Sequence, residues 1–351
     1  MERMRIAVAG FGAIGRKHAE VLRSCAACER VVIVEPGAQG RTQAQGMGFD
    51  VYPDIPAAWH AGGLGAAVIA TPTADHLETA SQCIERGLPI LVEKPLADGV
   101  EAANLLTGRA AAAGVPLLVG HHRRHSPVVR MAAELIGDGL IGQPTVATVL
   151  YTVRKPDAYF DIPWHVEPEG GGPILINLIH EVDQLRFLLG DVTSVQAMQS
   201  HAVRHLPVED SAVILLGFAS GAVGTVTLSD CVAAPWSYDL ASGEFDLMSD
   251  KAGLVDRGRE DTHFLSGTQG SLTLPNLRHY RFSGEQGWAH PLDVRQVPFE
   301  PGDPYRHQAE HFLRVAQGLE APLVTGADAT RTLEVTQAIK RAAKTGQAIP
   351  V

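Results

Sequence analysis

The first third of the chain alternates short, continuous apolar runs with longer segments of helical periodicity. The apolar runs predict strands that are buried on both faces, at Arg5–Ala9, Val31–Val34, Ala66–Ala70, Pro89–Val92 and Val115–Val119. The longer segments predict helices, which include Ala13–Cys25, Ala74–Gly87 and Asp98–Gly114. Strands of this kind that alternate with helices predict an α/β fold with a doubly wound parallel sheet.

Beyond about residue 123 both the strand-like runs and the loops become longer. Strands are predicted at Thr145–Val153, Ser194–Ala202 and Ser211–Leu228. Helices are predicted at Pro173–Leu189, which Gly190 closes, and at Tyr305–Gly318 and Ala327–Gly346. We therefore expect two domains: residues 1–123 with the parallel sheet, and residues 124–351 as an α+β domain with a mostly antiparallel sheet. An arrangement in which the last helices of the second domain pack on the first domain is compatible with this expectation.

One segment, Ser211–Ser229, carries no charged residue and raises the question of a membrane span. Glycines interrupt it at Gly217, Gly221 and Gly224, and β-branched runs flank the turn-like Ala219-Ser220-Gly221. This pattern is typical of a buried hairpin rather than a spanning helix.

Charge excludes two classes of partner. The chain has 29 Lys and Arg against 39 Asp and Glu, for a net charge of −10, and no block of basic residues. An acidic surface repels phosphate backbones and anionic lipids, so we expect neither a nucleic-acid nor a membrane partner. The N-terminus lacks the apolar region of a signal peptide. Four cysteines, at 25, 28, 83 and 231, are typical of a reduced, cytoplasmic protein.

A glycine motif of the form G-x-G-x-x-G lies between the first predicted strand and the first predicted helix. It consists of Gly10, Phe11, Gly12, Ala13, Ile14 and Gly15. The first glycine permits a tight turn, the second lets the backbone approach a pyrophosphate, and the third allows close packing of helix and strand. Glu35 ends the second predicted strand, 20 residues beyond Gly15, where a carboxylate binds the ribose hydroxyls of a dinucleotide. With strand, helix and acid all present, dinucleotide binding is favoured over a structural turn.

Glu35 also bears on the choice of dinucleotide. A carboxylate at this position repels a 2′-phosphate, which favours NAD over NADP. Arg41 lies nearby in sequence and would suit a 2′-phosphate, so NADP is the less favoured alternative.

A third feature, Glu93-Lys94-Pro95, directly follows a predicted strand. Ligands of an open parallel sheet bind beyond the carboxyl ends of its strands, so we expect Lys94 at the cofactor crevice. An isolated Glu-Lys pair at a strand end would instead indicate a simple ion pair.

These motifs, with two more, resemble the glucose–fructose oxidoreductase / inositol dehydrogenase / rhizopine-catabolism (Gfo/Idh/MocA) family over essentially the whole chain. The two further motifs are Ala70-Thr71-Pro72 with His76, and Gly170-Gly171-Gly172 leading to His180-x-x-Asp183. The resemblance implies a Rossmann domain followed by a domain with a large, open, mostly antiparallel sheet that forms a homodimer or homotetramer. It also implies NAD(P)-dependent oxidation or reduction of a sugar, sugar acid or cyclitol, and a cis bond between Lys94 and Pro95.

The resemblance also implies roles for individual residues. Lys94 would be the catalytic lysine and His180 the acid/base. Further cofactor contacts would come from Thr71, Pro72, His76, Glu93 and His122. Independently, a histidine is suited to take the proton of an oxidised alcohol at neutral pH, and a lysine ammonium to stabilise the developing alkoxide.

Substrate contacts are expected from Arg124, Trp164, His165, Asn177 and His180. Aromatic rings near a glycine-rich loop suit the apolar faces of a sugar, while His165 and Asn177 can bond hydroxyls. Ordinary packing under a long loop is an equally good interpretation of the aromatic residues.

Two positions depart from the family pattern. Many members carry an aspartate four residues before the histidine, where this chain has Ile176 followed by Asn177. His122 stands where an asparagine is common, before Arg124. The departures alter the expected orientation of His180 and the expected contacts near the nicotinamide.

Metal binding is not expected. His121, His122 and His125 are close in sequence, but neither a zinc-protease motif nor paired Cys motifs accompany them. Cys25-x-x-Cys28 has no second pair, and ordinary helix-end cysteines are the favoured interpretation.

Two alternatives to a dehydrogenase or reductase stay open. One is a redox-neutral NAD-dependent glycosidase of the same family. The other is a catalytically silent dinucleotide sensor, which needs neither Lys94 nor His180, so the presence of both counts against it.

Overall fold

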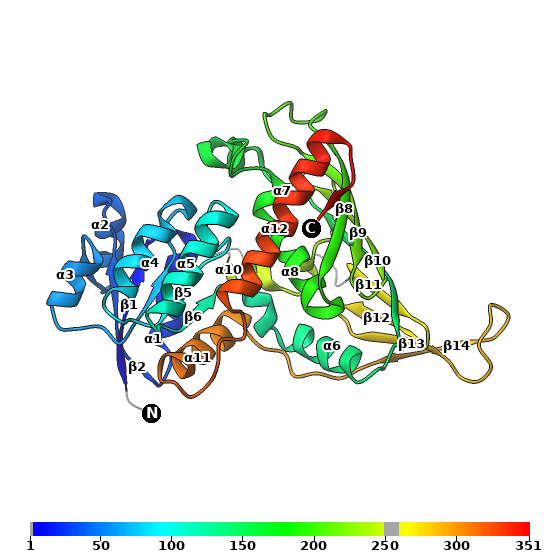
Figure 1. The fold of residues 1–351 in the computed structure, drawn as a ribbon, viewed down its shortest axis with the longest axis horizontal. Coiled ribbons are helices and arrows are strands. Elements are labelled where there is room, and N and C mark those ends of the chain that lie inside the picture. Colours follow the sequence, from blue (N-terminus) through cyan, green and yellow to red (C-terminus); the bar gives the residue numbers. More distant parts are fainter. Residues whose placement is uncertain (1–2, 249–259) are drawn as a thin grey trace. The chain divides into compact units, whose positions relative to one another are not determined.

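The computed structural model describes residues 3–248 and 260–351 (Figure 1). Contacts between Cα atoms group the chain into two compact units. Unit 1 comprises residues 1–125 and 302–333, and unit 2 comprises residues 126–301 and 334–351. The long helix α12 (Gly326–Thr345) therefore supplies residues to both units.

Unit 1 is built on a parallel sheet of six strands in the order β3-β2-β1-β4-β5-β6. The strands are β1 (Met4–Ala9), β2 (Cys28–Val34), β3 (Asp50–Tyr52), β4 (Ala66–Ile69), β5 (Ile90–Val92) and β6 (Leu117–Val119). The predicted doubly wound α/β fold is confirmed. Strand order reverses between β1 and β4, which is where ligands of such sheets bind.

The helices of unit 1 include one that comes from far along the chain. They are α1 (Ala13–Arg23), α2 (Ala38–Gly46), α3 (Ile55–His60), α4 (His76–Ile84), α5 (Val100–Ala112) and α11 (Pro304–Ala316). Short 3-10 turns lie at Thr73–Asp75 and His122–His125. Helix α11 packs on α1, so residues near 305 belong to the nucleotide-binding unit.

Unit 2 contains a nine-stranded sheet in the order β14-β13-β12-β11-β7-β10-β9-β8-β15. Its strands are β7 (Pro144–Thr152), β8 (Val192–Ser200), β9 (Ser211–Phe218), β10 (Val223–Ser229), β11 (His263–Gly267), β12 (Ser271–Leu274), β13 (Arg278–Phe282), β14 (Leu292–Gln296) and β15 (Ile349–Pro350). All neighbouring strands pair antiparallel except β7 and β10, which are parallel. The predicted mostly antiparallel sheet is therefore confirmed. The uncharged segment 211–229 forms the antiparallel hairpin β9–β10, which confirms that prediction.

Helices cover one face of this sheet. They include α6 (Pro127–Gly137), α8 (Leu178–Leu189) and the second half of α12, whose apolar side chains form one core with the inward residues of the strands. Shorter helical segments are α7 (Pro173–Ile176), α9 (Tyr238–Ala241), α10 (Glu244–Met248), and 3-10 turns at Asp157–Asp161 and Pro163–Val166.

The prediction of one continuous helix over Pro173–Leu189 is wrong. The chain forms α7 and α8 with a break at Asn177, whose φ of −108° departs from the helical value although its ψ of −49° does not. The amide of His180 bonds the Asn177 carbonyl oxygen at 3.0 Å, three residues back rather than four, so the chain winds more tightly here.

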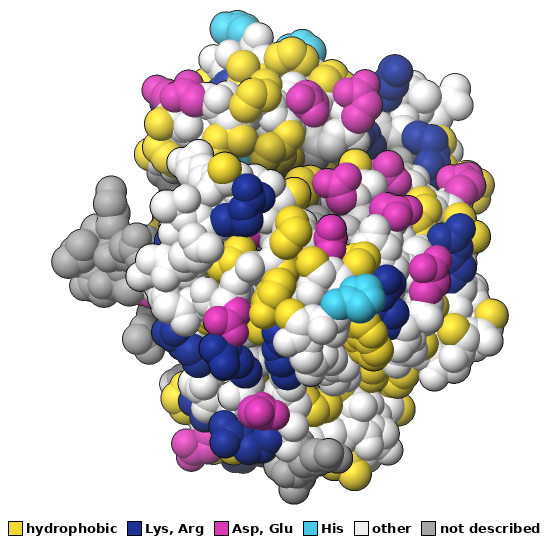
Figure 2. All heavy atoms as spheres, turned by 90° about the vertical axis from the view of Figure 1, so that its left-hand side faces the viewer, with side chains coloured by type: hydrophobic (Ala, Val, Ile, Leu, Met, Phe, Trp, Pro, Cys, Tyr) yellow, Lys and Arg dark blue, Asp and Glu magenta, His cyan; other side chains and the backbone are white. Residues whose placement is uncertain are grey.

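The molecular face in Figure 2 mixes Asp and Glu side chains with Lys and Arg side chains. Within residues 3–248 and 260–351, no helix combines the length and apolarity that crossing a membrane requires.

Candidate active site

The glycine motif forms the turn between β1 and α1, and each of its three glycines suits its position for a different physical reason. Gly10 adopts φ +89°, and a Cβ there would lie 2.4 Å from the Ala70 carbonyl oxygen. A Cβ on Gly15 would lie 2.1 Å from the carbonyl oxygen of Gly10. A Cβ on Gly12, the N-cap residue of α1, would meet no atom within 4 Å. Folding therefore requires Gly10 and Gly15, whereas Gly12 leaves open space at a helix N-terminus, as a pyrophosphate needs.

Glu35 ties the end of β2 to this loop. Its carboxylate accepts hydrogen bonds from the amides of Phe11 at 2.9 Å and Gly37 at 2.8 Å. The Arg41 guanidinium donates to the backbone carbonyls of Glu35 and Pro36. The carboxylate thus lies beside the glycine loop, where the sequence predicts a ribose, while Arg41 is held against the backbone.

His76 joins the two loops that follow β4 and β5. Its ring nitrogens lie 3.0 Å from the carbonyl oxygens of Thr71 and Pro95, and the side chain is buried. Burial lowers the pKa of His76, so the ring is neutral at pH 7 and donates to one of the two carbonyls. Next to it, Thr71 Oγ1 is buried without a hydrogen-bond partner among the described residues, which fits a polar ligand beside this loop.

Glu93 is held by a buried partner that the sequence analysis missed. His18 Nε2 on α1 lies 2.7 Å from Glu93 Oε1, and both side chains are buried. The other carboxylate oxygen accepts the amide of Lys94 at 3.2 Å. The Lys94–Pro95 bond is cis, as the resemblance implies, and the Lys94 side chain is half-buried.

The charge state of Glu93 follows from these contacts. Burial alone would raise the pKa of Glu93, but the hydrogen bond and charge of His18, with the charges of Lys94 and His122, hold that pKa below its ordinary value. A carboxyl whose pKa is depressed by folding stabilises the native state above its ordinary pKa, and this contribution is lost as pH falls through the folded value. We expect Glu93 to be ionised at pH 7 and to hold the backbone of Lys94.

Replacing His18 with leucine should lower the free energy of unfolding by about 3–5 kcal/mol, because it leaves the Glu93 carboxylate buried without its main partner. Urea denaturation at pH 7 measures the change. The control is His60→Leu, an exposed histidine at the end of α3, which should cost less than about 0.5 kcal/mol. Equal effects of the two variants would contradict the role of His18.

His122 and Arg124 lie in the 3-10 turn after β6 and contact other parts of unit 1. The His122 ring stacks on Tyr305 of α11, with centroids 4.3 Å apart. Arg124 is buried and pairs with Asp328 of α12. Both side chains thus also fasten the C-terminal helices of unit 1, a role in addition to the predicted cofactor and substrate contacts.

In unit 2, the glycine-rich loop before α7 packs closely against backbone and a carboxylate. A Cβ on Gly171 would lie 2.4 Å from the His165 carbonyl oxygen, and one on Gly172 would lie 2.6 Å from Glu209 Oε1. Glu209 accepts the amide of Ile174 at 2.8 Å. The loop is therefore fixed just before Asn177 and His180, and Gly171 and Gly172 serve this packing, whereas a Cβ on Gly170 would meet no atom within 4 Å.

Of the predicted substrate residues, Trp164 is half exposed and His165 is buried. The His165 ring stacks on Tyr159 at 3.9 Å, and its Nδ1 lies 2.6 Å from the Tyr159 carbonyl oxygen. Burial lowers the pKa of His165, and the charge of Lys155 adds to that shift. His180 is half-buried in the first turn of α8.

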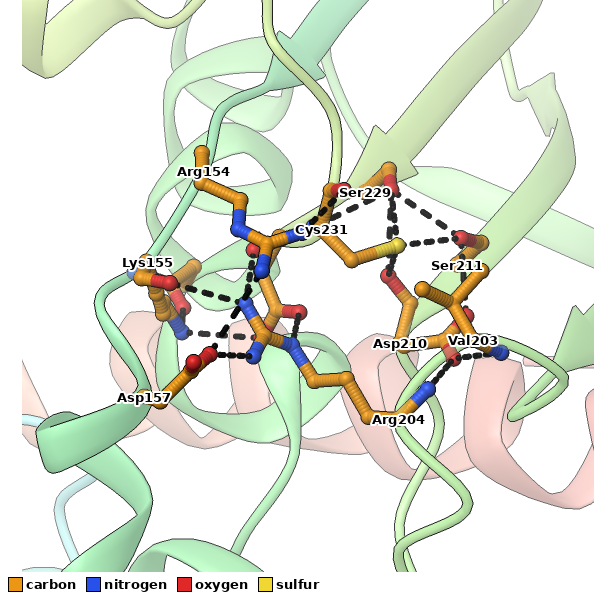
Figure 3. Close-up of polar contacts among 11 residues, drawn as sticks. Arg154, Lys155, Asp157, Val203, Arg204, Asp210, Ser211, Ser229 and Cys231 are labelled. Atoms are coloured by element: carbon orange, nitrogen blue, oxygen red, sulfur yellow. Dashed lines mark hydrogen bonds and ion pairs between the residues drawn. The ribbon is translucent and has the colours of Figure 1, made fainter.

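Lys155 brings an unexpected cation to this group. It follows β7, and its ammonium lies 2.7 Å from Asn177 Oδ1 and 3.5 Å from the buried Asp230 carboxylate. Burial lowers the pKa of Lys155, and Asp230 opposes part of that shift. Arg204 also pairs with Asp230, at 2.9 Å, and Figure 3 shows its side chain extending toward Lys155 and Asp157.

The cysteines and histidines give no sign of metal or redox chemistry within the part of the chain that the structure describes. No group of three or more His, Cys, Asp or Glu there could hold a metal ion. All four cysteines are free and buried. Burial raises the pKa of Cys28 to about 11, and also that of Cys25, so the reactive thiolate is disfavoured in the C-x-x-C motif.

Sequence reasoning missed His18, Lys155 and Asp230. His18 lies three residues after Gly15, on the face of α1 that packs on the sheet, and this position could have suggested a buried role. Lys155 and Asp230 each follow a predicted strand, but nothing in the sequence indicates that β7 and β10 are neighbours.

A parallel sheet with a glycine loop, an acid at the second strand end and a second α+β unit defines a two-domain dinucleotide-binding protein. The model described as "Oxidoreductase family, NAD-binding Rossmann fold" matches residues 4–121, and "Oxidoreductase family, C-terminal alpha/beta domain" matches residues 133–351. The chain belongs to the Gfo/Idh/MocA oxidoreductase family, as its motifs predicted.

Characterised relatives are similar over most of the chain. A 1,5-anhydro-D-fructose reductase from Ensifer adhaerens is 28% identical over 288 residues, which cover 82% of this chain and 79% of the relative. A scyllo-inositol 2-dehydrogenase (NAD(+)) from Bacillus subtilis (strain 168) is 27% identical over 357 residues, 99% of this chain and 96% of the relative. Among solved structures, a putative NADPH-dependent oxidoreductase from Desulfitobacterium hafniense has the same fold, with a TM-score of 0.84, 18% identity, and coverage of 100% of this chain and 98% of the other.

Proposed function

We propose that this oxidoreductase transfers a hydride between NAD and a hydroxyl or carbonyl group of a sugar, sugar acid or cyclitol. The observation that carries the proposal is the loop at the start of α1, where Gly12 leaves open space and the Glu35 carboxylate lies at the adjacent strand end. The substrate class is supported by relatives that are named for an anhydro sugar and an inositol. NAD supplies the hydride acceptor when it is bound.

The protein's own residues supply the remaining chemistry. We assign the pyrophosphate to the amides at the start of α1 and the adenosine ribose to Glu35. Lys94, with its backbone held by Glu93, would stabilise negative charge on the substrate oxygen. His180 would take the hydroxyl proton during oxidation and return it during reduction.

Cofactor preference can be tested at Glu35. The wild-type protein should bind NADH more tightly than NADPH, because the carboxylate repels a 2′-phosphate. Glu35→Ala should narrow the difference by about tenfold, the scale of about 1.4 kcal/mol. Fluorescence titrations with both cofactors measure it, and Arg41→Ala is the matched variant, which should leave the NADH preference in place. Tighter NADPH binding by the wild type would contradict the preference.

We further propose a cytoplasmic homodimer or homotetramer that associates through the outer face of the unit 2 sheet. The support is a set of exposed apolar side chains on that face, Val146, Met198, Val213, Leu215, Val223 and Phe264. Register places Val146 opposite Val223 and Met198 opposite Val213, with Thr225 and Gln196 on the same face beside Leu215, so apolar pairs alternate with polar side chains across this face. Free, buried thiols support a reducing compartment.

A panel of polyols, sugars and sugar acids, assayed with NAD at the NADH absorbance band, tests the reaction. Net NADH accumulation with one of them supports a dehydrogenase. Product formation without NADH accumulation would instead support the redox-neutral glycosidase. Cofactor binding without turnover of any compound would support the dinucleotide sensor.

A further inference from the structure

Lys155 is an almost buried cation close to the expected substrate group of unit 2. Only 11% of its side chain is exposed. Its ammonium contacts Asn177 Oδ1 at 2.7 Å and the Asp230 carboxylate at 3.5 Å, and lies 4.5 Å from the centre of the Tyr159 ring. Burying an ammonium group costs free energy unless the charge is paired and hydrogen-bonded. These contacts therefore restrict the position of the Lys155 ammonium.

The position of Lys155 is fixed from its backbone as well (Figure 3). Its amide donates to the Asp230 carbonyl oxygen at 2.9 Å, and its own carbonyl oxygen accepts from Arg204 at 2.9 Å. Asp230 is fully buried and shared between the two cations. Lys155 is therefore anchored to the ends of β7 and β10, independently of α7 and α8.

Asn177 connects this anchor to His180. Its side-chain oxygen accepts from Lys155, while its backbone oxygen accepts the His180 amide at 3.0 Å. Asn177 is also the residue at which the helix breaks. Because Ile176 cannot offer a carboxylate to the His180 ring, the orientation of His180 has to depend on other contacts.

We infer that Lys155 is a positioning residue. Through its hydrogen bond to Asn177 it fixes the break between α7 and α8, and so sets the direction in which the His180 side chain projects from α8. The inference rests on the role proposed for His180 and adds the residue that orients it. Lys155 acts through the Asn177 side chain, so removing either partner should have the same consequence.

The kinetic test uses two near-isosteric variants, Lys155→Met and Asn177→Leu, and their double variant. Each single change should lower kcat with the best panel substrate by about 10–100-fold, with NADH affinity within about threefold of the wild type. The double variant should be no more than about threefold slower than the slower single variant, because both changes remove one interaction. Lys155→Arg, which keeps a donor, should recover part of the loss.

Arg154→Met is the matched control, because Arg154 is the adjacent cation, 54% exposed, and pairs with Asp157 rather than Asn177. It should keep kcat within about twofold. If the effects of Lys155→Met and Asn177→Leu multiply in the double variant, Lys155 acts independently of Asn177 and the inference is overturned.

A second readout does not need turnover. In protein labelled at the histidine Cε1 carbon and assigned with a His180→Gln variant, NMR should show a shifted His180 signal in Lys155→Met and Asn177→Leu. The signal should be unchanged in Arg154→Met, and that of exposed His60 unchanged in all variants. If Lys155→Met does not fold, Asn177→Leu and Lys155→Arg carry the same test.

The two readouts separate this inference from the proposed function. A shifted His180 signal in a protein that turns over none of the panel would uphold the positioning role and contradict the dehydrogenase. Full turnover with an unshifted His180 signal in Lys155→Met would uphold the dehydrogenase and overturn the positioning role.

Discussion

Lys94→Met is expected to lower turnover by about 10²–10⁴-fold while NADH affinity stays within severalfold of the wild type. This is the scale on which one charge-stabilising or proton-transferring group acts. The glycine loop and Glu35, which we assign to the cofactor, lie on other elements, so binding should survive the change. Single-turnover absorbance at the NADH band, with separate cofactor titrations, distinguishes the two effects.

Lys94→Arg serves as the matched variant. It keeps a positive charge on a longer, planar group, so it should recover part of the rate without restoring it. Near-normal turnover in Lys94→Met would assign Lys94 to the structure of the loop after β5 and favour the sensor.

His180→Ala should remove most of the oxidation rate and also the acid limb of the pH–rate profile. If His180 takes the hydroxyl proton, oxidation requires its neutral form and declines as pH falls through its pKa. Ile176→Asp would place a carboxylate about one turn before His180. This carboxylate favours the imidazolium and raises the histidine pKa, so the acid limb should move to higher pH. Profiles of kcat/KM between pH 5 and pH 9 measure both changes.

The control for the second variant is Ile176→Asn, which has a similar volume but no charge and should leave the limb in place. If His180→Ala keeps both its rate and its acid limb, another group accepts the proton. The buried His165 would then be the first candidate.

The parallel sheet could be predicted because its strands are buried on both faces and appear as continuous apolar runs. The strand β3, only three residues long, and the polar helix α2 were missed because neither has enough apolar periodicity to stand out. The break at Asn177 was missed for another reason. The apolar pattern runs through it without interruption, and the break involves a contact from Lys155, 22 residues earlier in the chain.

The site shows the same division. Gly10, Gly12, Gly15 and Glu35 form a local motif whose spacing follows from one strand–helix–strand unit, so the sequence could predict that Glu35 lies beside the glycine loop. Pairs such as His18 with Glu93, 75 residues apart, depend on which strand ends the fold brings together. No periodicity along the chain carries that information.

The glycines of the loop after β1 are under different constraints: two are required for folding, and one is required only for the proposed cofactor binding. Gly10 and Gly15 would be retained by any lineage that needs this fold, because a methyl group at either position collides with the backbone. Gly12 has room for a methyl group. Alanine there would lower the conformational entropy of the unfolded chain and so stabilise the native state. In a homologue that no longer binds a dinucleotide, substitution of Gly12 would therefore be tolerated, whereas Gly10 and Gly15 would still be required for folding. A side chain at residue 12 would then indicate loss of cofactor binding in a protein that keeps the fold.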